Sequence, residues 1–378
     1  MLWNGIRICF AVVFLGLHAA VWLGIFLEWV REKRRGKQLA PLPKVSVIVP
    51  IHNEEHRMHH ILSTVLVQTY PESEFIFVED GSTDSSFAVL QRFAHDHPDF
   101  PLQILQLDSN PGPNHKQYAL QKALTVAQGS IILFTDADCE IPPHWIESMV
   151  QQFTDSTVGA VLGPVFKIPG GSSFFHRYQC FDHAVRYMYL VGSTGLGSPG
   201  GGFGNNLAVR RATLEAIGGY EAVPFSQTED AALIARIRSQ SQYTVHAALN
   251  RSLFVMTEGE TTWKAFINQT LRWNNGGLFG PDKTTRLNFG FLMLTIAAGM
   301  LAIPLIPWIP SVWTLSATVF LAMTGNTLIT LKHFGSALPR GTLIYSIQCL
   351  FTPLYFTFLT ILGFCRVKTY WKNHPPEH

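Results

Sequence analysis

Long apolar stretches lie at the two ends of the chain, and a mixed pattern of apolar and polar residues lies between them. Residues 8–27 are apolar except for small residues and His18, and about 20 apolar residues match the roughly 30 Å hydrocarbon core of a bilayer. Three further apolar stretches lie near the C-terminus, at residues 287–309, 312–331 and 343–364. The pattern predicts an N-terminal transmembrane anchor within residues 1–30 and a C-terminal transmembrane region, of about three helices, within residues 287–365.

Basic residues beside the anchor predict its orientation. Directly after the anchor come Arg31, Lys33, Arg34, Arg35 and Lys37. The positive-inside rule places the chain from residue 31 onward in the cytoplasm. Because no small-x-small cleavage site precedes these residues, we expect an uncleaved anchor rather than a signal peptide. If all three C-terminal stretches span the membrane, the basic residues of the tail, 366–378, lie on the side opposite to residue 31. The positive-inside rule disfavours this, so either the rule fails there or one C-terminal stretch is re-entrant or interfacial.

The middle of the chain alternates short β-branched runs with stretches of helical periodicity. Strands are predicted at residues 44–50, 74–78, 102–107 and 130–135, and helices up to residue 68, over 85–95 and over 116–127. This alternation is typical of an α/β fold with a mostly parallel sheet and helices on both faces. We expect such a domain over residues 31–260. Ligands of these folds bind beyond the carboxyl ends of the strands.

Composition and charge support this division. Charged residues make up 14% of the 378 residues, well below the roughly 25% of an average soluble protein, and most of them lie between residues 31 and 286. The net charge is only +2 and the basic residues cluster at the anchor, so we expect no binding to nucleic acid. The five cysteines lack the spacing of a metal site, and we expect no disulfide.

Polar residues follow each of the four predicted strands. They are Asn53 and Glu54, then Glu79 and Asp80, then Lys116, then Asp136 and Asp138. Because the carboxyl ends of parallel strands meet at one edge of a sheet, we expect these side chains to converge. Two carboxylates at i and i+2, as in Asp136 and Asp138, can hold a hard divalent cation such as Mg²⁺ or Mn²⁺.

The order of these motifs resembles a membrane-anchored family 2 glycosyltransferase with the GT-A (Rossmann-like) nucleotide-sugar-binding fold, related to lipid glycosyltransferases and polysaccharide synthases. The resemblance runs from about residue 44 to residue 273. It is carried by the motifs Pro50-x-x-Asn53-Glu54, Glu79-Asp80-Gly81-Ser82, Asp136-x-Asp138, Thr228-Glu229-Asp230 and Gln269-x-x-Arg272-Trp273.

The resemblance implies a role for each motif. Asp136 and Asp138 are implied to hold Mg²⁺ or Mn²⁺, and Asp230 to act as the general base with Glu229 as helper. The stretch 195–206 is glycine-rich without the sequence of a P-loop, and it is implied to border the acceptor through Gly202, Gly204, Asn205 and Asn206. The residues implied to bind the nucleotide sugar are Pro50, Asn53, Glu54, Glu79, Asp80, Lys116, Asp136, Gln269, Arg272 and Trp273.

Residues 261–286 are expected to form an amphipathic helix along the membrane interface. Phe266 and Leu271 fall on its apolar face, and Gln269 and Arg272 lie roughly opposite, at i and i+3. The apolar face can then meet lipid or the core, while Arg272 and Gln269 face the diphosphate.

Each motif also has a purely structural interpretation. Asp84 is expected to cap the helix that follows it, and Thr228 fits an N-cap. Lys116 fits a solvated helix N-terminus, and Trp273 an interfacial anchor. Four nearby histidines lack the H-E-x-x-H pattern of a metal site, so we expect a solvated helix face. They are His52, His56, His59 and His60.

The favoured function is inverting transfer of one sugar from a nucleoside-diphosphate sugar to a lipid-type acceptor, by a multi-pass protein at the cytoplasmic face of the cell membrane. A processive polysaccharide synthase is the alternative. A non-catalytic nucleotide-sugar-binding subunit would have lost a metal-binding or base residue, and both are present. A dinucleotide-dependent oxidoreductase needs Gly-x-Gly-x-x-Gly after the first strand, and the chain has Ile51-His-Asn-Glu-Glu there.

Overall fold

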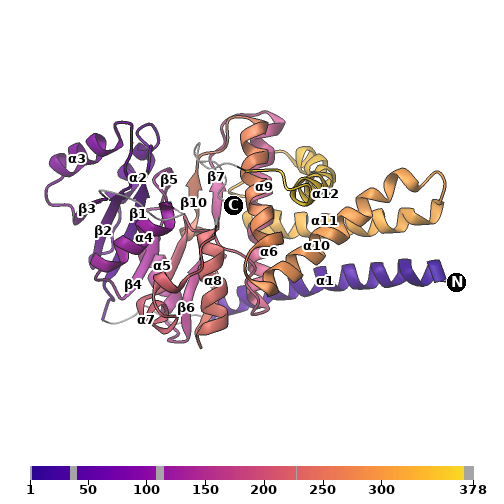
Figure 1. The fold of residues 1–378 in the computed structure, drawn as a ribbon, viewed down its shortest axis with the longest axis horizontal. Coiled ribbons are helices and arrows are strands. Elements are labelled where there is room, and N and C mark those ends of the chain that lie inside the picture. The colour runs from indigo at the N-terminus through magenta and orange to yellow at the C-terminus, as the bar shows by residue number, and fades with distance from the viewer. Residues whose placement is uncertain (1, 35–40, 108–114, 227, 370–378) are drawn as a thin grey trace. The chain divides into compact units, whose positions relative to one another are not determined.

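The computed structural model describes residues 2–34, 41–107, 115–226 and 228–369 (Figure 1). The chain forms two compact units, each built from segments far apart in the sequence. The helical unit comprises Met1–Leu27, Lys167–Gly200 and Gly259–His378. The sheet unit comprises Glu28–Phe166 and Gly201–Glu258. Of the residues used in the predictions, Arg35, Lys37 and residues 370–378 of the tail lie outside the described ranges.

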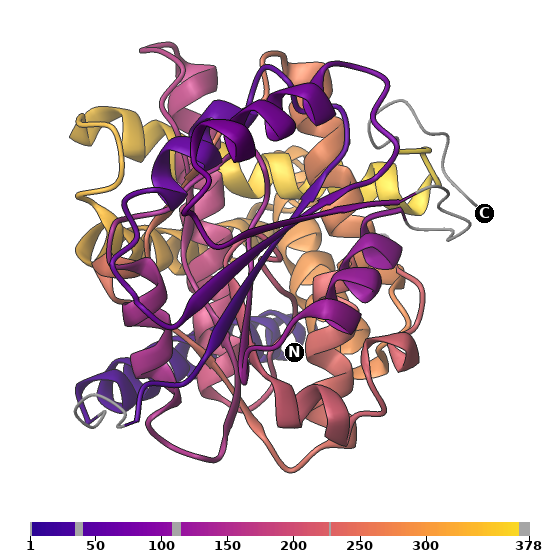
Figure 2. The same cartoon turned by 90° about the vertical axis from the view of Figure 1, so that its left-hand side faces the viewer.

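Seven strands form the main sheet of the sheet unit: β1 (Val45–Ile51), β2 (Ser73–Glu79), β3 (Leu102–Gln106), β4 (Ile131–Phe134), β6 (Val158–Leu162), β8 (Leu207–Arg210) and β9 (Thr244–Ala247). Their order is β3-β2-β1-β4-β8-β6-β9, and the sheet is visibly twisted (Figure 2). β1 is parallel to β2 and β4, β2 to β3, and β6 to β9, whereas β8 is antiparallel to β4 and β6. The expected α/β fold with a mostly parallel sheet is confirmed.

Helices cover both faces of this sheet. They are α2 (Met58–Val65), α3 (Ser86–Asp96), α4 (His115–Val126), α5 (Trp145–Val150), α7 (Arg211–Ala216) and α8 (Glu229–Gln240), with short 3-10 helices η1 (Gln151–Phe153), η2 (Tyr220–Ala222) and η3 (Arg251–Leu253). Alternate side chains of β1 point to opposite faces, and Val47 and Val49 share a core with Ile61 of α2. The helix α4 also contacts β1 and β2, and its buried Leu120 lies outside that core.

A second, smaller sheet has the strand order β5 (Cys139–Glu140), β10 (Val255–Thr257) and β7 (Val165–Lys167). It begins directly after the D-x-D motif, because β5 follows Asp138. In the antiparallel pairing of β10 with β5, Thr257 lies opposite Cys139. This small sheet therefore supports the D-x-D motif from the side away from β4.

The predicted elements of the sheet unit are present with small shifts at their ends. The strand predicted at 102–107 is β3, and the helix predicted at 116–127 is α4, which begins one residue earlier. The helix predicted to run up to residue 68 is shorter, since α2 ends at Val65. The strands match well because parallel strands that are buried on both faces read as continuous apolar runs.

The helical unit contains, within the described residues, α1 (Leu2–Lys33) up to Leu27, α6 (Phe174–Gly195), α9 (Trp263–Phe279), α10 (Lys283–Leu301), α11 (Trp313–Phe334) and α12 (Thr342–Phe364), with short 3-10 helices η4 (Ile303–Leu305) and η5 (Pro310–Val312). Four segments of it are long and apolar enough to cross a membrane: Trp3–Lys33, Lys283–Leu305, Pro310–Phe334 and Ile344–Phe364. They coincide with the four apolar stretches of the sequence. The proposed domain boundaries and the orientation in the membrane stay predictions.

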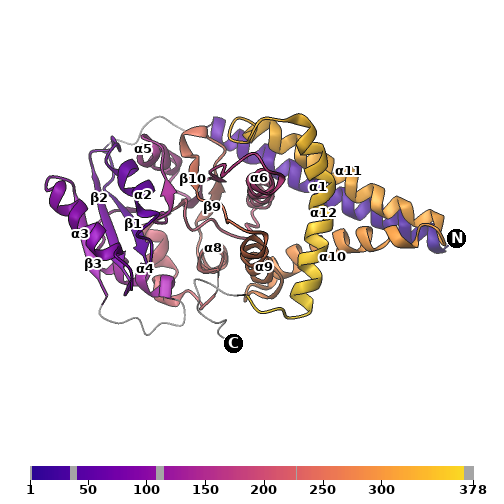
Figure 3. The ribbon, with the colours of Figure 1, turned by 90° about the horizontal axis from the view of Figure 1, so that it is seen from above.

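Two of these helices, α1 and α11, run side by side (Figures 1 and 3). The Trp3 indole donates to Ser311 Oγ at 2.9 Å, and the Trp22 indole donates to Asn326 Oδ1 at 2.6 Å. Both contacts join residues in the same order along the two helices, so α1 and α11 are parallel.

The helices α1 and α6 cross at three glycines. A Cβ on Gly24 would lie 1.9 Å from the Gly192 carbonyl oxygen, and a Cβ on Gly195 would lie 2.0 Å from the Gly24 carbonyl oxygen. Small residues at a helix crossing allow the two backbones to touch, which strengthens packing between apolar helices.

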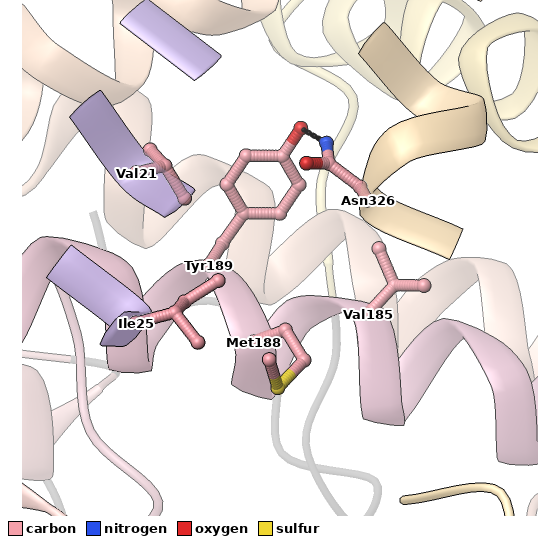
Figure 4. A pocket seen from close by; sticks show the side chains of 6 residues that line it. All are labelled: Val21, Ile25, Val185, Met188, Tyr189 and Asn326. Carbon is pink, nitrogen blue, oxygen red and sulfur yellow. Dashed lines mark hydrogen bonds between the residues drawn. The ribbon is translucent and has the colours of Figure 1, made fainter. Parts of the chain in front are cut away.

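A small pocket lies beside this crossing, where Tyr189 of α6 also bonds Asn326 of α11 (Figure 4). The Tyr189 hydroxyl lies 2.8 Å from His18 Nε2 as well. The pocket is lined by Val21, Ile25, Val185, Met188, Tyr189 and Asn326. These bonds pair the polar groups that α1, α6 and α11 bury between them, as an apolar environment requires.

Candidate active site

The D-x-D motif lies just past the carboxyl end of β4. The side chains of Asp136 and Asp138 are partly exposed, at 31% and 20%. The Thr257 hydroxyl donates to Asp138 Oδ2 at 3.1 Å, so β10 fixes one oxygen of this carboxylate. The motif therefore presents two adjacent carboxylates at the edge of the sheet where the sequence predicted a site.

Lys116, at the start of α4, links the D-x-D motif to the T-E-D motif. Its Nζ lies 2.8 Å from Asp136 Oδ1 and 3.2 Å from Glu229 Oε1. Burial disfavours the charged ammonium, yet the two carboxylates outweigh burial and raise the pKa of Lys116 well above its ordinary value. Lys116 is thus a fixed cation between two acidic motifs, and its interpretation as a solvated helix N-terminus is wrong.

Asp230 lies in the first turn of α8, with both carboxylate oxygens held by backbone donors. The Gly204 amide donates to Asp230 Oδ2 at 2.8 Å, and the Ala231 amide donates to Oδ1 at 2.7 Å. Burial raises the pKa of Asp230, and the neighbouring Glu229 carboxylate raises it further, while Lys116 and the two amides oppose the rise. The result is an oriented carboxyl group that keeps its proton to a higher pH than an ordinary aspartate.

The glycine-rich loop packs directly against Asp230. A Cβ on Gly202 would lie 2.9 Å from Asp230 Cβ and 3.0 Å from its carbonyl carbon, and a Cβ on Gly204 would lie 3.3 Å from Asp230 Cβ. Only glycine permits so close an approach at residue 202 without a shift of the backbone. This packing explains why residues 202 and 204, which lie against Asp230 of the T-E-D motif, are glycines.

The two asparagines of the loop differ in their surroundings. Asn205 Nδ2 lies 3.7 Å from the sulfur of Cys139. Asn206 is fully buried; its Oδ1 accepts from the Trp145 indole at 2.9 Å. Its Nδ2 donates to two backbone carbonyls, those of Pro164 and Leu253. Asn206 thus anchors the loop to the core, and its amide hydrogens are already used within the protein.

The loops after β1 and β2 are tied together on the expected nucleotide side. Asn53 has a left-handed backbone, with φ of 54°, and its Oδ1 accepts from the Thr83 amide at 2.8 Å. Glu79 Oε1 accepts from the Ser82 amide at 2.5 Å. Asn53 and Glu79 therefore shape the turn after β2. Pro50 lies in β1, opposite Val78 of β2.

Asp80 is almost fully buried at the end of β2 and faces two histidines. Its Oδ2 lies 3.6 Å from Nδ1 of His115, the first residue of α4. Its backbone carbonyl oxygen lies 2.7 Å from His52 Nδ1. Asp84 lies one residue before Ser85, the N-cap of α3, and its Oδ1 accepts from the Ser86 amide at 2.9 Å, so it holds the first amide of that helix.

Arg57 is a residue of this site that the sequence analysis missed. Its Nη2 lies 2.8 Å from Glu54 Oε2, and its Nη1 lies 3.8 Å from Asp138 Oδ2. Arg57 comes three residues after Glu54, immediately before α2, so a basic residue at that spacing was the available signal. Its contact with Asp138 depends on the fold and could not be read from spacing.

His60 corrects one prediction. His56 and His59 are exposed as expected, but the His60 side chain is only 14% exposed. Its Nδ1 lies 2.7 Å from Glu140 Oε1, and its Nε2 lies 2.9 Å from Glu258 Oε1. Burial lowers the pKa of His60, but the two carboxylates outweigh burial and raise it overall. His60 therefore joins α2 to Glu140 of β5 and to Glu258, the residue that follows β10.

The Q-x-x-R-W motif lies on α9 in the helical unit. The predicted amphipathic helix is present there but ends at Phe279, before Gly280 and Pro281, which is a common way for a helix to end. Gln269 Nε2 donates to Glu260 Oε1 at 2.7 Å. The Trp273 ring packs edge-on against His183 at 5.4 Å between centroids. The roles of Gln269, Arg272 and Trp273 toward a diphosphate stay predictions.

The D-x-D motif fits a divalent cation by the chemistry of its donors. Within the described residues, no group of three or more His, Cys, Asp and Glu side chains is arranged to hold a metal ion. Asp136 and Asp138 nevertheless present two partly exposed carboxylates, the ligands that Mg²⁺ and Mn²⁺ prefer, and such ions commonly complete their coordination with water and substrate phosphates.

Comparison with known proteins agrees with this geometry. The family profile described as "Glycosyl transferase family 21" matches residues 8–375. A beta-monoglucosyldiacylglycerol synthase of Nostoc sp. (strain PCC 7120) is 27% identical over 277 residues, which are 73% of this chain and 57% of that protein. A probable glycosyltransferase, YdaM, of Bacillus subtilis (strain 168) is 26% identical over 282 residues, 71% of this chain and 64% of that protein. The chain thus spans less than two thirds of the length of these relatives.

One solved structure resembles the whole chain. It is the mannosyltransferase PcManGT from Pyrobaculum calidifontis, in complex with GDP-Man and Mn²⁺. The TM-score is 0.57 and the sequence identity 22%, and the match covers 95% of this chain and 99% of that one. At this identity the resemblance establishes the fold.

Proposed function

The chain belongs to glycosyl transferase family 21, and from this premise we propose that it transfers one sugar from a nucleoside-diphosphate sugar to a membrane lipid, with inversion, at the cytoplasmic face. The observation that carries this proposal is the row of contacts from Asp136 through Lys116 to Glu229, beside the oriented carboxyl group of Asp230. In this row, Asp136, which can hold a metal ion for the donor diphosphate, lies close to Asp230, which can accept the proton of an acceptor hydroxyl.

Asp230 is the proposed general base. In a single displacement, the acceptor oxygen bonds to the anomeric carbon of the sugar as the bond from that carbon to the diphosphate oxygen breaks. The acceptor proton passes to Asp230. A base works best when its pKa lies near the working pH, and the raised pKa of Asp230 moves in that direction. The amides of Gly204 and Ala231 keep the carboxylate in one orientation.

Asp136 and Asp138 are the proposed ligands of Mg²⁺ or Mn²⁺. When bound, the ion neutralises negative charge on the departing nucleoside diphosphate. The Mn²⁺ and GDP-Man in the structurally similar mannosyltransferase support this proposal. Asp80, buried beside His52 and His115, is proposed to contact the nucleoside, with Glu54 supporting the same edge.

Gln269, Arg272 and Trp273 are the proposed contribution of the helical unit. Arg272 offers a planar guanidinium that suits phosphate oxygens. Gln269 is already bonded to Glu260, so it is proposed to fix the loop that enters α9. Trp273 is proposed to pack near the acceptor.

A lipid acceptor is supported by two observations. Four helices are apolar enough to hold the chain in a bilayer, where a lipid substrate is found. The Nostoc relative is, by its name, a synthase of monoglucosyldiacylglycerol. We therefore propose a lipid with a free hydroxyl. We propose the cytoplasmic orientation because basic residues, Arg31 and Lys33 in the last turn of α1 and Arg34 after it, follow the apolar stretch.

A transfer assay with the full-length chain tests this function. The purified protein in lipid nanodiscs is incubated with radiolabelled nucleotide sugars, one at a time, together with Mn²⁺ and a membrane lipid extract. Label is expected in one lipid-soluble product. An Asp230→Asn variant is expected to lose at least about 100-fold in rate, and Asn retains an oxygen that can accept from the Gly204 amide. Full turnover by this variant, or a ladder of long polymers, would refute the proposal.

A further inference from the structure

Each carboxylate of the D-x-D motif already faces a cationic side chain. Lys116 Nζ lies 2.8 Å from Asp136 Oδ1, and Arg57 Nη1 lies 3.8 Å from Asp138 Oδ2. The two cations come from separate parts of the sheet unit, since Lys116 opens α4 and Arg57 precedes α2. The fold therefore supplies one positive charge for each of the two carboxylates.

Each of these cations is also held by a second acid. Lys116 Nζ lies 3.2 Å from Glu229 Oε1, and Arg57 Nη2 lies 2.8 Å from Glu54 Oε2. Glu54 and Glu229 are both almost fully buried, so their charges need a partner in the folded protein. Lys116 or Arg57 could thus move away from the D-x-D motif and still be held beside it by its second acid.

The geometry points to a competitive role for Lys116 and Arg57: they are tethered counter-ions of Asp136 and Asp138, which a divalent cation has to displace. This inference rests on the proposed metal role of the D-x-D motif. A monovalent and a divalent cation on one carboxylate repel each other, and the repulsion is large where water is scarce. The two side chains therefore weaken the binding of the metal ion and stabilise the metal-free protein.

Lys116 is expected to contribute more than Arg57. Its ammonium is closer to its carboxylate and its side chain is 18% exposed, against 36% for Arg57. Solvent screens an exposed pair and reduces its effect. Removal of either positive charge is therefore predicted to strengthen the binding of the metal ion, and removal of the charge of Lys116 to strengthen it more.

Binding of Mn²⁺ to the full-length protein in detergent, without nucleotide, tests the inference. Free Mn²⁺ is measured by electron paramagnetic resonance, and the melting temperature is recorded in EDTA and in Mn²⁺. Lys116→Met is expected to bind Mn²⁺ about tenfold more tightly than the unmodified protein. It is also expected to melt at a lower temperature in EDTA and to gain more stability from Mn²⁺. Arg57→Met is expected to change in the same direction by less.

Three control variants separate charge from other effects. Lys116→Arg keeps the positive charge and is expected to bind Mn²⁺ like the unmodified protein. Lys122→Met removes an exposed lysine from the same helix, where its Nζ lies over the Tyr118 ring, and is expected to change nothing. Arg92→Met, on an exposed position of α3, is the corresponding control for Arg57.

The outcomes distinguish this inference from the proposed function. Equal or weaker Mn²⁺ binding by Lys116→Met, with the unmodified protein binding normally, overturns the competitive role alone and makes Lys116 an aid to metal binding. Absence of Mn²⁺ binding in every variant overturns both the inference and the proposed metal role. If Lys116→Met does not fold, Lys116→Gln and Arg57→Met carry the same test, and unchanged binding in both overturns the inference.

Discussion

At the scale of single residues, the account depends on the environment of Asp230. Burial and the Glu229 carboxylate raise its pKa, and Lys116 opposes the rise. In the proposed mechanism the general base must be deprotonated to act, so acidification is expected to stop the reaction when Asp230 takes up a proton. Because its pKa lies above the ordinary value for aspartate, about 3.9, activity is expected to be lost at a higher pH than for an exposed aspartate.

Glu229→Gln tests this electrostatic account. The change removes a negative charge beside Asp230, so the pKa of Asp230 falls and the acid limb of the kcat profile moves to lower pH. Without the Glu229 carboxylate as a partner, Lys116 also lowers the pKa of Asp230 more strongly. The measurement is kcat against pH for both proteins, with Glu215→Gln on the exposed side of α7 as the matched control. An acid limb that stays in place, or moves to higher pH, contradicts the assignment of Asp230 as base.

Arg57 and His60 show which residue roles the sequence left hidden. The acidic motifs up to Asp138 were found because each follows a strand, and strands follow from local apolar runs. The partners of His60 are 80 and 198 residues away in the sequence, so no local pattern distinguishes it from its exposed neighbours His56 and His59. The contact of Arg57 with Asp138 is equally remote. Roles that depend on tertiary contacts became visible only in the structure.

At the scale of elements, the glycine-rich loop and the start of α8 act as one part. A Cβ on Gly202 would lie 2.9 Å from Asp230 Cβ, which real structures avoid. Gly202→Ala is therefore expected to displace Asp230, to reduce kcat by at least about tenfold, and to cost roughly 1–3 kcal/mol of stability. Steady-state kinetics and thermal melting check both effects.

Gly200→Ala is the matched control in the same loop. Among the described residues, a Cβ there would meet only Ser193 Oγ, at 3.9 Å, which is an ordinary contact. Its kcat and melting temperature are expected to stay close to those of the unmodified protein. Equal effects of the two substitutions would mean that loop composition, rather than the contact with Asp230, sets the activity.

The crossing of α1 and α6 is a second element-scale feature with a direct test. Gly24→Ala places a Cβ 1.9 Å from the Gly192 carbonyl oxygen, so the helices must separate. We expect a loss of roughly 1–3 kcal/mol or more, seen as a lower melting temperature in detergent. Gly16→Ala, on the same helix, meets no atom of the described residues within 4 Å and is expected to melt normally. Equal melting of both variants would show that this crossing does not hold the helical unit together.

The elements themselves were largely predictable. The four strands predicted before residue 136 and the four apolar helices all appear, because each has a strong local pattern. The position of the antiparallel strand β8 between β4 and β6 could not be predicted, since strand order depends on contacts between distant segments. The amphipathic helix was predicted too long, because the turn at Gly280 and Pro281 was not used to end it.

At the scale of the whole molecule, the distribution of charge agrees with membership of a glycosyltransferase family. The expected resemblance to a membrane-anchored glycosyltransferase with a GT-A fold is confirmed, and the family profile that matches is that of family 21. Charged side chains gather between residues 31 and 286, while the apolar helices lie near the ends of the chain. This arrangement suits the proposed transfer from a water-soluble donor to a lipid acceptor.

The most direct test of the central claim is the mass and anomeric configuration of the lipid product. The full-length chain in nanodiscs is supplied with the donor identified by the transfer assay, and the product is extracted, weighed by mass spectrometry and analysed by NMR. The account predicts one lipid carrying a single added sugar, with the anomeric configuration opposite to that of the donor. A series of masses spaced by one sugar, or a product that retains the donor configuration, would contradict it.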